Sequence, residues 1–209
     1  MYSPPAFRED RIEVMHALMR VHPLAMLITA GEGGLLANPL PFSVIGTGGN
    51  GLLRAHIAAA NDQVPALRTG TEALVVFQGP QAYVTPSLYA SKREHGRVVP
   101  TWNYVVVQAR GVATVIDDPA WLRAQVSALT AEREHGRAAP WQVDDAPESF
   151  VAAQMKGIVG LEIPIARLEG KWKISQNRAD PDRLGVAEGL RDEGLAPDMA
   201  ALVAAAGHR

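Results

Sequence analysis

The feature that most constrains this fold is a stretch from residue 24 to about residue 116 in which short β-prone runs alternate with turn residues. Ala25–Ala30 is an apolar run, and Gly31–Gly34 provides a turn directly after it. Closely spaced strands with short turns pair antiparallel, because a parallel pair needs a longer crossover connection. The pattern therefore favours a small antiparallel barrel over a βαβ sheet.

The strongest hairpin signal is Asn50-Gly51, because both residue types tolerate the positive φ angles of a tight turn. Leu52–Ile57 would be the returning strand. Leu35–Ile45 precedes the turn and contains two prolines, which cannot donate to a ladder, so this run should lie at an edge or a bulge. Further strands are expected at Glu72–Gln78 and Ala82–Pro86, paired across Gly79-Pro80, at Tyr104–Ile116 with Gly111 as a bulge, at Leu161–Ile165 and at Gly170–Ile174.

Helices are expected on both sides of this stretch. Apolar residues recur mostly three and four positions apart over Asp10–Arg20, which predicts an amphipathic helix that Pro23 closes. Asp118 is a typical N-cap and Pro119 a typical first helical residue, so Ala120–Glu134 should be helical, with Leu122, Val126 and Leu129 on one face. A second helix should begin near Pro147-Glu148 and end before Gly160, and the tail over 182–207 should be partly helical.

These elements predict an α+β, β-led fold. The chain has no linker rich in serine, glycine or proline, so we expect one domain over residues 1–209, with helical additions at about 120–160 and 180–207.

Composition excludes several classes of function. The 209 residues include no cysteine, which excludes disulfide scaffolds, thiol nucleophiles and cysteine-ligated zinc or iron–sulfur sites. The formal net charge of -2 argues against a generally basic surface that coats DNA, so DNA binding is unsupported by charge. No apolar run approaches the roughly 20 residues of a membrane span. The start, Met1–Pro5, does not resemble a signal peptide, so we expect a cytoplasmic protein that does not contact membranes.

The short motifs of the chain do not indicate a specific chemistry. Gly46–Gly51 matches G-x-G-x-x-G, but the prolines before it and the reversal at Asn50-Gly51 argue against a dinucleotide fold. The six histidines have no metal-binding spacing, and no G-x-S-x-G elbow is present, so we expect no metal and no serine hydrolase chemistry. Arg-Glu-His-Gly-Arg occurs twice, from Arg93 and from Arg133; we interpret the match as coincidence, because the residues before the two copies differ.

Polar and aromatic residues are concentrated in three segments, Arg54–Asn61, Tyr83–Tyr104 and Gly170–Arg178. Together they supply cations and hydroxyls suited to a phosphate, and amides and aromatic rings suited to a flat heteroaromatic ring. The alternative is that the aromatic side chains belong to a barrel core and the cations are solvated. Composition gives the two interpretations equal weight.

At these residues the chain resembles the PaiB-type FMN-binding negative transcriptional regulators, over nearly its whole length. The segments that carry the resemblance are Met1–Phe7, Val75–Pro80, Val99–Tyr104 and Leu168–Arg178. The sequence departs from the family pattern at Thr85 and Leu88, where Ser and Trp are expected. If the residue at 88 faces the flavin, loss of the aromatic ring would weaken stacking by about 0.5 to 1.5 kcal/mol.

The resemblance implies an FMN-binding split β-barrel with peripheral helices, which pairs as a homodimer with each flavin near the subunit interface. By position, Arg54, His56, Ala58 and Asn61 would meet the FMN phosphate and ring edge. The same cleft would be lined by Lys92, Thr101, Trp102 and Asn103. It would also be reached, across the dimer, by Lys173, Ser175, Gln176 and Arg178 of the late strand.

Three functions are consistent with this resemblance. The leading one is an FMN-binding protein with a role in negative transcriptional regulation. The second is a flavin-dependent oxidoreductase that uses a reduced nicotinamide, for which no catalytic residue can be named because FMN itself would carry the hydride. The third is a repressor that contacts DNA directly, which ranks last because the chain lacks a clear helix-turn-helix and is slightly acidic.

Overall fold

The structure, a computed structural model, describes residues 1–46 and 48–207. Thr47 of the predicted Gly46–Gly51 turn and His208 lie outside the described residues. The chain forms two compact units. One, here called the terminal unit, comprises Met1–Leu18, Gln78–Val107 and Glu169–Arg209, and the other, the central unit, comprises Met19–Phe77 and Gln108–Leu168. The single domain over residues 1–209 stays a prediction.

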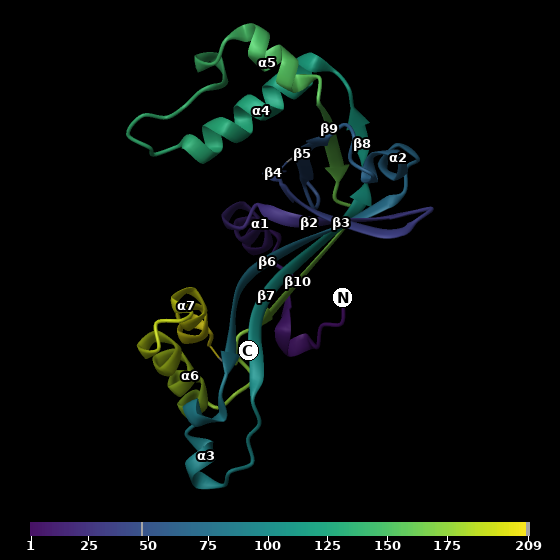
Figure 1. Cartoon of the computed structure of the whole chain (residues 1–209). Coiled ribbons are helices and arrows are strands. Elements are labelled where there is room, and N and C mark those ends of the chain that lie inside the picture. The colour runs from purple at the N-terminus through teal and green to yellow at the C-terminus, as the bar shows by residue number, and fades with distance from the viewer. Residues whose placement is uncertain (47, 208–209) are drawn as a thin grey trace. The chain divides into compact units, whose positions relative to one another are not determined.

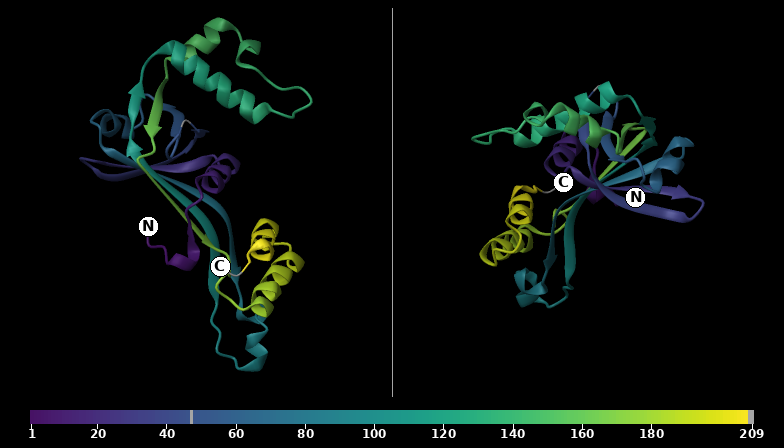
Figure 2. Two further views of the ribbon diagram at one scale, coloured as in Figure 1. Left: turned by 180° about the vertical axis from the view of Figure 1, so that it is seen from behind. Right: turned by 45° about the horizontal axis from the view of Figure 1, so that its top comes forward.

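The central unit is built on antiparallel strands (Figure 1). One sheet has the order β4-β5-β9-β8, and elsewhere in the unit β2 pairs with both β3 and β6. Figure 2 shows β2 and β3 as a long hairpin. The bounds are β2 Leu24–Gly31, β3 Gly34–Pro41, β4 Ser43–Ile45, β5 Leu52–Ala58, β6 Glu72–Val84, β7 Thr101–Val112, β8 Thr114–Ile116 and β9 Ile158–Pro164.

Strand β5 shows how the sequence builds this core. Leu53, Ala55 and Ile57 are buried, while Arg54 and His56 alternate with them and point to the other face. This period of two is the side-chain geometry of a strand. The register of β5 places Leu53 opposite Ile163 and Ala55 opposite Leu161 of β9, so apolar residues of both strands share the buried face.

The hairpin at Asn50-Gly51 is confirmed, with a longer loop than expected. Strands β4 and β5 pair antiparallel from Ile45↔Leu52, so the loop covers the residues between them. Positive φ angles occur at Gly48, Gly49 and Gly51 and not at Asn50. The Asn50 side chain instead donates to the carbonyl oxygens of Ile165 and Ala166, at 3.3 and 3.4 Å.

Three strand predictions need correction. The predicted pair joined across Gly79-Pro80 is wrong, because β6 runs unbroken through both residues. Its alternation of buried and exposed residues slips by one position there, which lets the strand pass a proline without reversing. The run over Leu35–Ile45 divides into β3 and β4 at the buried Phe42, and the run over Tyr104–Ile116 divides into β7 and β8 at Ala113. In both cases the two parts belong to different sheets, which a continuous β-prone run cannot reveal.

The predicted helices are largely confirmed. Asp118 caps α4 by accepting from the Ala120 amide at 3.0 Å, with Pro119 as the first helical residue. Leu122 and Leu129 are buried on one face of α4, together with Gln125. In Figure 1, α4 and α5 run side by side in the central unit. The helices are α1 Ile12–Val21, α2 Gln63–Arg68, α3 Ser91–Glu94, α4 Pro119–Glu134, α5 Glu148–Met155, α6 Asp180–Asp192 and α7 Pro197–Ala205.

The terminal unit contains the strand order β1-β10-β7-β6, with β1 at Arg8–Glu9 and β10 at Arg167–Lys173. Strands β6, β7 and β10 contribute residues to both units. Helices α6 and α7 pack as a pair (Figures 1 and 2), and Val186 and Leu190 of α6 and Met199 and Val203 of α7 are buried. Three short 3₁₀ turns lie at Pro5–Phe7, Pro86–Leu88 and Val143–Asp145.

Both copies of Arg-Glu-His-Gly-Arg end a helix. The copy from Arg93 closes α3 and the copy from Arg133 closes α4, with His95 and His135 as the C-cap residues. The glycines that follow, Gly96 and Gly136, have φ angles of 67° and 83°. Glycine is the usual residue in this left-handed position after a helix, because it has no Cβ to clash. The shared letters therefore have a shared structural role.

No helix within residues 1–46 and 48–207 is long and apolar enough to cross a bilayer. The same residues include no group of three or more histidine and acidic side chains arranged to hold a metal ion.

Candidate functional site

The turn that follows β10 is the most constrained segment among the predicted site residues. Ser175 has a φ angle of 63°, and among the described residues it is the only residue other than glycine with a positive φ. The Asn103 side-chain amide donates to the Ser175 hydroxyl at 2.9 Å, and both residues are buried. Such backbone strain persists only where the surroundings hold it, and it is concentrated at functional sites.

The buried Gln176 side chain locks the same turn from within. Its Oε1 accepts from the Ile174 amide at 2.8 Å, and its Nε2 donates to the Trp172 carbonyl at 2.5 Å. The Arg178 amide donates to the Ser175 carbonyl at 3.0 Å. Gln176 was predicted to contact the ligand, but in this structure both ends of its side chain bind the backbone.

Lys173 joins this turn to the start of β7. Its ammonium group donates to the Thr101 hydroxyl and to the Trp102 carbonyl, the latter at 2.6 Å. Burial lowers the pKa of Lys173, and the nearby positive charges of Lys171 and Arg178 lower it further. A cluster of cations that disfavour one another's charge is a place where a bound anion is stabilised.

Aromatic rings surround these cations in the terminal unit. Trp102 is 49% exposed, meets Tyr83 edge-to-face at 5.9 Å, and donates its indole N–H to Gln81 at 2.7 Å. Lys171 lies over the ring of Tyr2 at 5.6 Å and over that of Tyr104 at 5.2 Å. It also donates to the Tyr2 carbonyl at 3.0 Å.

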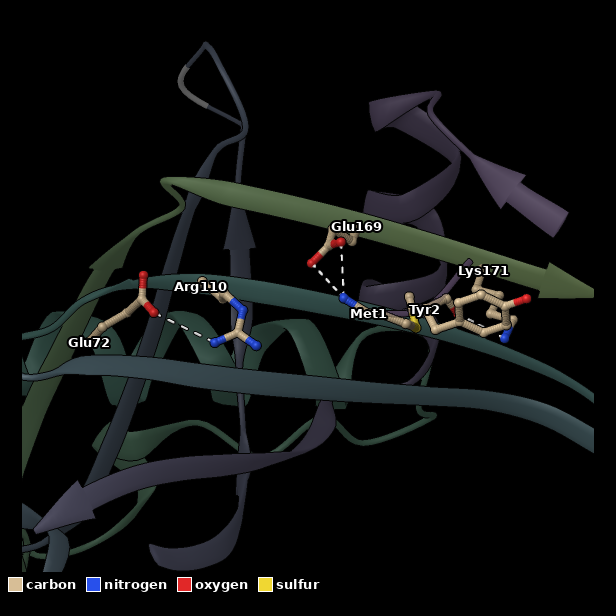
Figure 3. Close-up of polar contacts among 6 residues, drawn as sticks. All are labelled: Met1, Tyr2, Glu72, Arg110, Glu169 and Lys171. Atoms are coloured by element: carbon tan, nitrogen blue, oxygen red, sulfur yellow. Dashed lines mark hydrogen bonds and ion pairs between the residues drawn. The ribbon is translucent and has the colours of Figure 1, made fainter. Parts of the chain in front are cut away.

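Figure 3 shows the contact between Tyr2 and Lys171, and beside it the ion pair between the Met1 amine and Glu169 at 3.1 Å. These contacts tie the first residues of the chain to β10. The same figure draws a separate pair of the central unit, Glu72 and Arg110, at 3.5 Å.

Arg178 and Lys92, also predicted site residues, lie among polar contacts of the terminal unit. The Arg178 guanidinium stacks over the Tyr89 ring at 4.9 Å from its centroid. Burial raises the pKa of the Tyr89 hydroxyl, and the charge of Arg178 opposes that shift. Lys92 is exposed and donates to the Ser87 hydroxyl at 3.1 Å.

The two departures from the family pattern have distinct outcomes. The Thr85 hydroxyl accepts from the Ser87 amide at 3.3 Å, a role that serine can also fill. Leu88 packs against α6, where a Cβ on Gly189 would lie 2.2 Å from Leu88 Cδ2. Leu88 therefore contributes to the packing of α6.

The remaining predicted residues belong to the central unit. The side chains of Arg54, His56 and Asn61 each contact another residue of that unit, and Ala58 is exposed. Arg54 donates to Glu162 at 2.7 Å and lies over the Trp121 ring at 5.7 Å. His56 Nδ1 is 3.0 Å from the side-chain oxygen of Gln125. Ala58 and the two alanines after it are exposed, but the Ala59 amide donates to the Gly157 carbonyl and the Ala58 carbonyl accepts from the Asn61 amide, both at 2.9 Å.

Asn61 and Gln63 form a network that sequence reasoning missed in part. The Asn61 side chain accepts from the amide of Gln63, the first residue of α2, at 2.9 Å. Gln63 is fully buried; its amide nitrogen donates to Leu27 O, Thr29 Oγ1 and Leu36 O, and its oxygen accepts from Asn38. Gln125 was missed too. Its position between Leu122 and Leu129 on the buried stripe of α4 was the available signal.

The predicted site residues therefore form two local groups. The structure brings Thr101, Trp102 and Lys173 together, and it joins Asn103 to Ser175. Arg54, His56, Ala58 and Asn61 lie along β5 and the loop to α2. A phosphorylated, planar ligand suits the residues of the first group, because they combine clustered cations, a constrained hydroxyl and exposed aromatic rings.

Comparison with known proteins agrees with this chemistry. Residues 1–167 match the family described as "Putative FMN-binding domain". Lys173, Ser175, Gln176 and Arg178 lie beyond the matched residues. The chain is 29% identical to "Protease synthase and sporulation protein PAI 2" of Bacillus subtilis, over 92% of this chain and 90% of that protein. It is 35% identical to "Uncharacterized protein AN0679" of Emericella nidulans, over 93% of this chain and 92% of that protein.

Solved structures support the fold. The FAD and heme binding protein from Mycobacterium smegmatis superposes with a TM-score of 0.60 at 21% identity, covering 90% of this chain and 81% of that one. The flavocytochrome Anf3 from Azotobacter vinelandii gives a TM-score of 0.59 at 17% identity, covering 84% and 71%. The strand-rich α+β fold expected from the sequence is thereby confirmed, and these two proteins share it. Because residues 1–167 match its model, this chain belongs to the FMN-binding domain family, and it is similar over nearly its whole length to the Bacillus subtilis PAI 2 protein.

Proposed function

We propose that this protein binds FMN as a cytoplasmic homodimer and acts in negative transcriptional regulation. The observation that carries the flavin assignment is the cluster of Lys171, Lys173 and Arg178, in which Lys173 is held by the Thr101 hydroxyl and the Trp102 carbonyl. Burial lowers the pKa of Lys173, and the charges of Lys171 and Arg178 lower it further. An anionic phosphate or a reduced flavin ring would relieve that repulsion. The cluster lies in a chain that belongs to an FMN-binding family.

Residues of the terminal unit would hold the cofactor. Lys173, Arg178 and Lys92 would contribute charge, and Ser175 and Asn103 would contribute polar contacts from a turn that is already ordered. Trp102 would offer a ring face to the planar part of the ligand. For Arg54, His56, Ala58 and Asn61 of the central unit, contact with FMN stays a prediction from the sequence. When bound, FMN supplies a ring that accepts and donates electrons or hydride.

The regulatory part of the proposal rests on the full-length similarity to the Bacillus subtilis protein, whose name refers to protease synthesis and sporulation. The net charge of -2 gives no general attraction for DNA, so regulation through a partner or a metabolite is the version we favour. Zero cysteine means that, if redox state is the signal, the flavin is the group that senses it.

An FMN titration tests the cofactor directly. We expect saturable binding to the purified protein, with a Kd of roughly micromolar or tighter, equivalent to about -8 kcal/mol. Lys173→Met should weaken FMN binding about tenfold or more, because hydrogen bonds to charged groups contribute about 1.5–3 kcal/mol. Arg191→Met, at an exposed position of α6, is the matched control and should bind FMN as the parent chain does. Absence of FMN binding at these concentrations would overturn the proposal.

Two further measurements address assembly and regulation. Sedimentation should give twice the chain mass if the protein is a homodimer, and a monomer would contradict that part of the proposal. Deletion of the gene should raise transcription of its targets. Salt-resistant retention of a promoter fragment would indicate direct repression, whereas retention lost at modest salt would reflect nonspecific charge.

A flavin-dependent oxidoreductase is the second candidate. The half-exposed Trp102, whose carbonyl binds Lys173, favours it, because an open ring next to the proposed flavin could stack a planar electron donor. Anaerobic mixing of the FMN-loaded protein with a reduced nicotinamide distinguishes the two. Rapid bleaching of the flavin, followed by turnover with an acceptor, would favour the enzyme.

A further inference from the structure

The central unit contains a cavity of about 710 Å³ that the proposed flavin site does not use. It is open on one side and is lined by the start of α4, by residues along α5, by one face of α2, by the beginning of β9 and by Ala59, which follows β5. None of the residues predicted to contact FMN lines it. The volume falls within the range of roughly 300–1,000 Å³ that is typical of small-molecule sites.

The wall of this cavity is apolar. Val64 of α2, Leu122 of α4 and Val159 of β9 are buried and form its inner side. Met155 and Ile158 continue the wall, and small residues such as Ala152 leave the space between the helices open. An apolar wall of this size favours the body of a hydrophobic ligand over water.

Charged residues at the rim are mostly paired with one another. Arg68 donates to both oxygens of Asp117, at 2.8 and 2.5 Å, and the guanidinium lowers the pKa of that carboxyl group. Arg123 donates to Glu148 at 3.1 Å and to Asp144 at 2.7 Å. These pairs neutralise the two guanidinium groups locally.

Lys156 is the exception at the rim. It is exposed, it directly follows α5, and no ion pair or hydrogen bond of its side chain occurs within the described part of the chain. The cavity therefore combines an apolar wall with one uncommitted positive charge at its mouth. A ligand that matches both has an apolar body and a single anionic group.

We propose that this cavity is a second binding site, for a small amphipathic monocarboxylate of the medium-chain fatty acid class. The hydrocarbon chain would lie against Val64, Leu122 and Val159, and the carboxylate would pair with Lys156 at the mouth. Because α4, α5 and β9 all line the cavity, a bound ligand would fasten the α4–α5 pair to the sheet. The residues named for FMN do not line this cavity, but Ala59, which follows Ala58 in the chain, does, so competition with FMN tests whether the two sites are separate.

Calorimetric titration of the full chain with decanoate tests the proposal. Decanoate should bind saturably, and 1-decanol and decylamine should bind more weakly, because they lack the carboxylate. Lys156→Ala should weaken decanoate binding about fivefold, as expected for a partly exposed ion pair, and should leave 1-decanol binding unchanged. Arg191→Ala is the control for a cation elsewhere and should have no effect.

Two adjacent alanines of α5 provide a control for the cavity itself. Both Ala152 and Ala153 are exposed, but only Ala152 lines the cavity. Ala152→Trp should fill the space and abolish decanoate binding, and Ala153→Trp should not. The proposal is overturned if decanoate fails to bind, if binding survives Ala152→Trp, or if 1-decanol binds as tightly as decanoate.

Competition with FMN separates this site from the flavin site. Decanoate binding should be unaffected by saturating FMN, and Ala152→Trp should bind FMN normally. Displacement of decanoate by FMN would contradict a second site while leaving the flavin proposal intact.

Discussion

The side-chain amide of Asn103 donates a 2.9 Å hydrogen bond to the hydroxyl of Ser175, a residue held at a φ angle of 63°. The bond joins β7 to the turn after β10, across 72 positions of sequence. It supports a backbone conformation that costs about 1–3 kcal/mol for a residue with a Cβ. The two residues therefore fix the turn that presents Lys173 and Arg178.

Removal of the Asn103 amide should destabilise the chain. Asn103→Ala leaves the buried Ser175 hydroxyl without its donor, and we expect a loss of about 1–3 kcal/mol in the free energy of unfolding. Urea denaturation measures it. Asn177→Ala, at an exposed position of the same turn, is the control and should cost much less. Equal losses in the two variants would show that the Asn103–Ser175 bond has no special role.

The lowered pKa of Lys173 predicts a pH dependence of stability. Between that lowered pKa and the ordinary value of 10.5, the unfolded chain binds more protons than the folded chain, so folding becomes more favourable as pH rises. Below this window both states carry the charge and the penalty is constant. Lys173→Met should remove this contribution, and the stability of the parent chain relative to the variant should rise as pH approaches 10.5. Urea unfolding of both proteins across this window provides the measurement. Parallel pH profiles would contradict the prediction.

The Trp121 ring of α4 leaves no room for a side chain at Gly160 of β9. A Cβ at Gly160 would lie 2.2 Å from the Trp121 ring, so Gly160→Ala forces the ring away and should destabilise the central unit by about 1–3 kcal/mol. Gly33→Ala is the matched control, because a Cβ there meets nothing within 4 Å, and its effect should stay within about 0.5 kcal/mol. Thermal unfolding of both variants measures the difference. A Gly160→Ala chain as stable as the control would mean that Trp121 repacks freely.

The buried Gln63 should not tolerate a charge. In Gln63→Glu the new oxygen would face the carbonyls of Leu27 and Leu36, which now accept from the amide nitrogen at 3.0 and 3.2 Å. An uncompensated buried charge costs about 3–5 kcal/mol, so we expect severe destabilisation at neutral pH. Gln154→Glu, exposed on α5, should be nearly neutral. Denaturant unfolding gives both values, and near-native stability of Gln63→Glu would refute the network's role.

Local patterns predicted most elements because the responsible interactions are local. The cap at Asp118, the proline that follows it and the alternation in β5 each act within a few residues. The strand predictions were wrong where one run of β-prone residues passes from one sheet to the other. The sequence on either side of Phe42 or of Ala113 is equally suited to a strand, and only pairing with other strands decides which sheet each part joins. Gly79-Pro80 failed in the same way, because a slip in β6 replaces the expected reversal.

The candidate site divides along similar lines. Residue types and a family resemblance were sufficient to name Lys173, Ser175 and Arg178, since cations and hydroxyls carry their chemistry wherever they lie. The sequence could not reveal that Gln176 binds the backbone, or that Asn103 supports Ser175, because these contacts depend on distances in space. Gln63 escaped notice because nothing in its immediate neighbours marks a fully buried glutamine.

From the sequence alone follow a β-led α+β chain and the absence of thiol chemistry, since composition and strand periodicity are properties of neighbouring residues, and the resemblance to a known family added the expectation of FMN. Only the tertiary structure decided which strands share a sheet, which polar groups satisfy one another and where an apolar cavity remains. Those outcomes depend on long-range packing, in which each buried group must find its partner among residues distant in sequence.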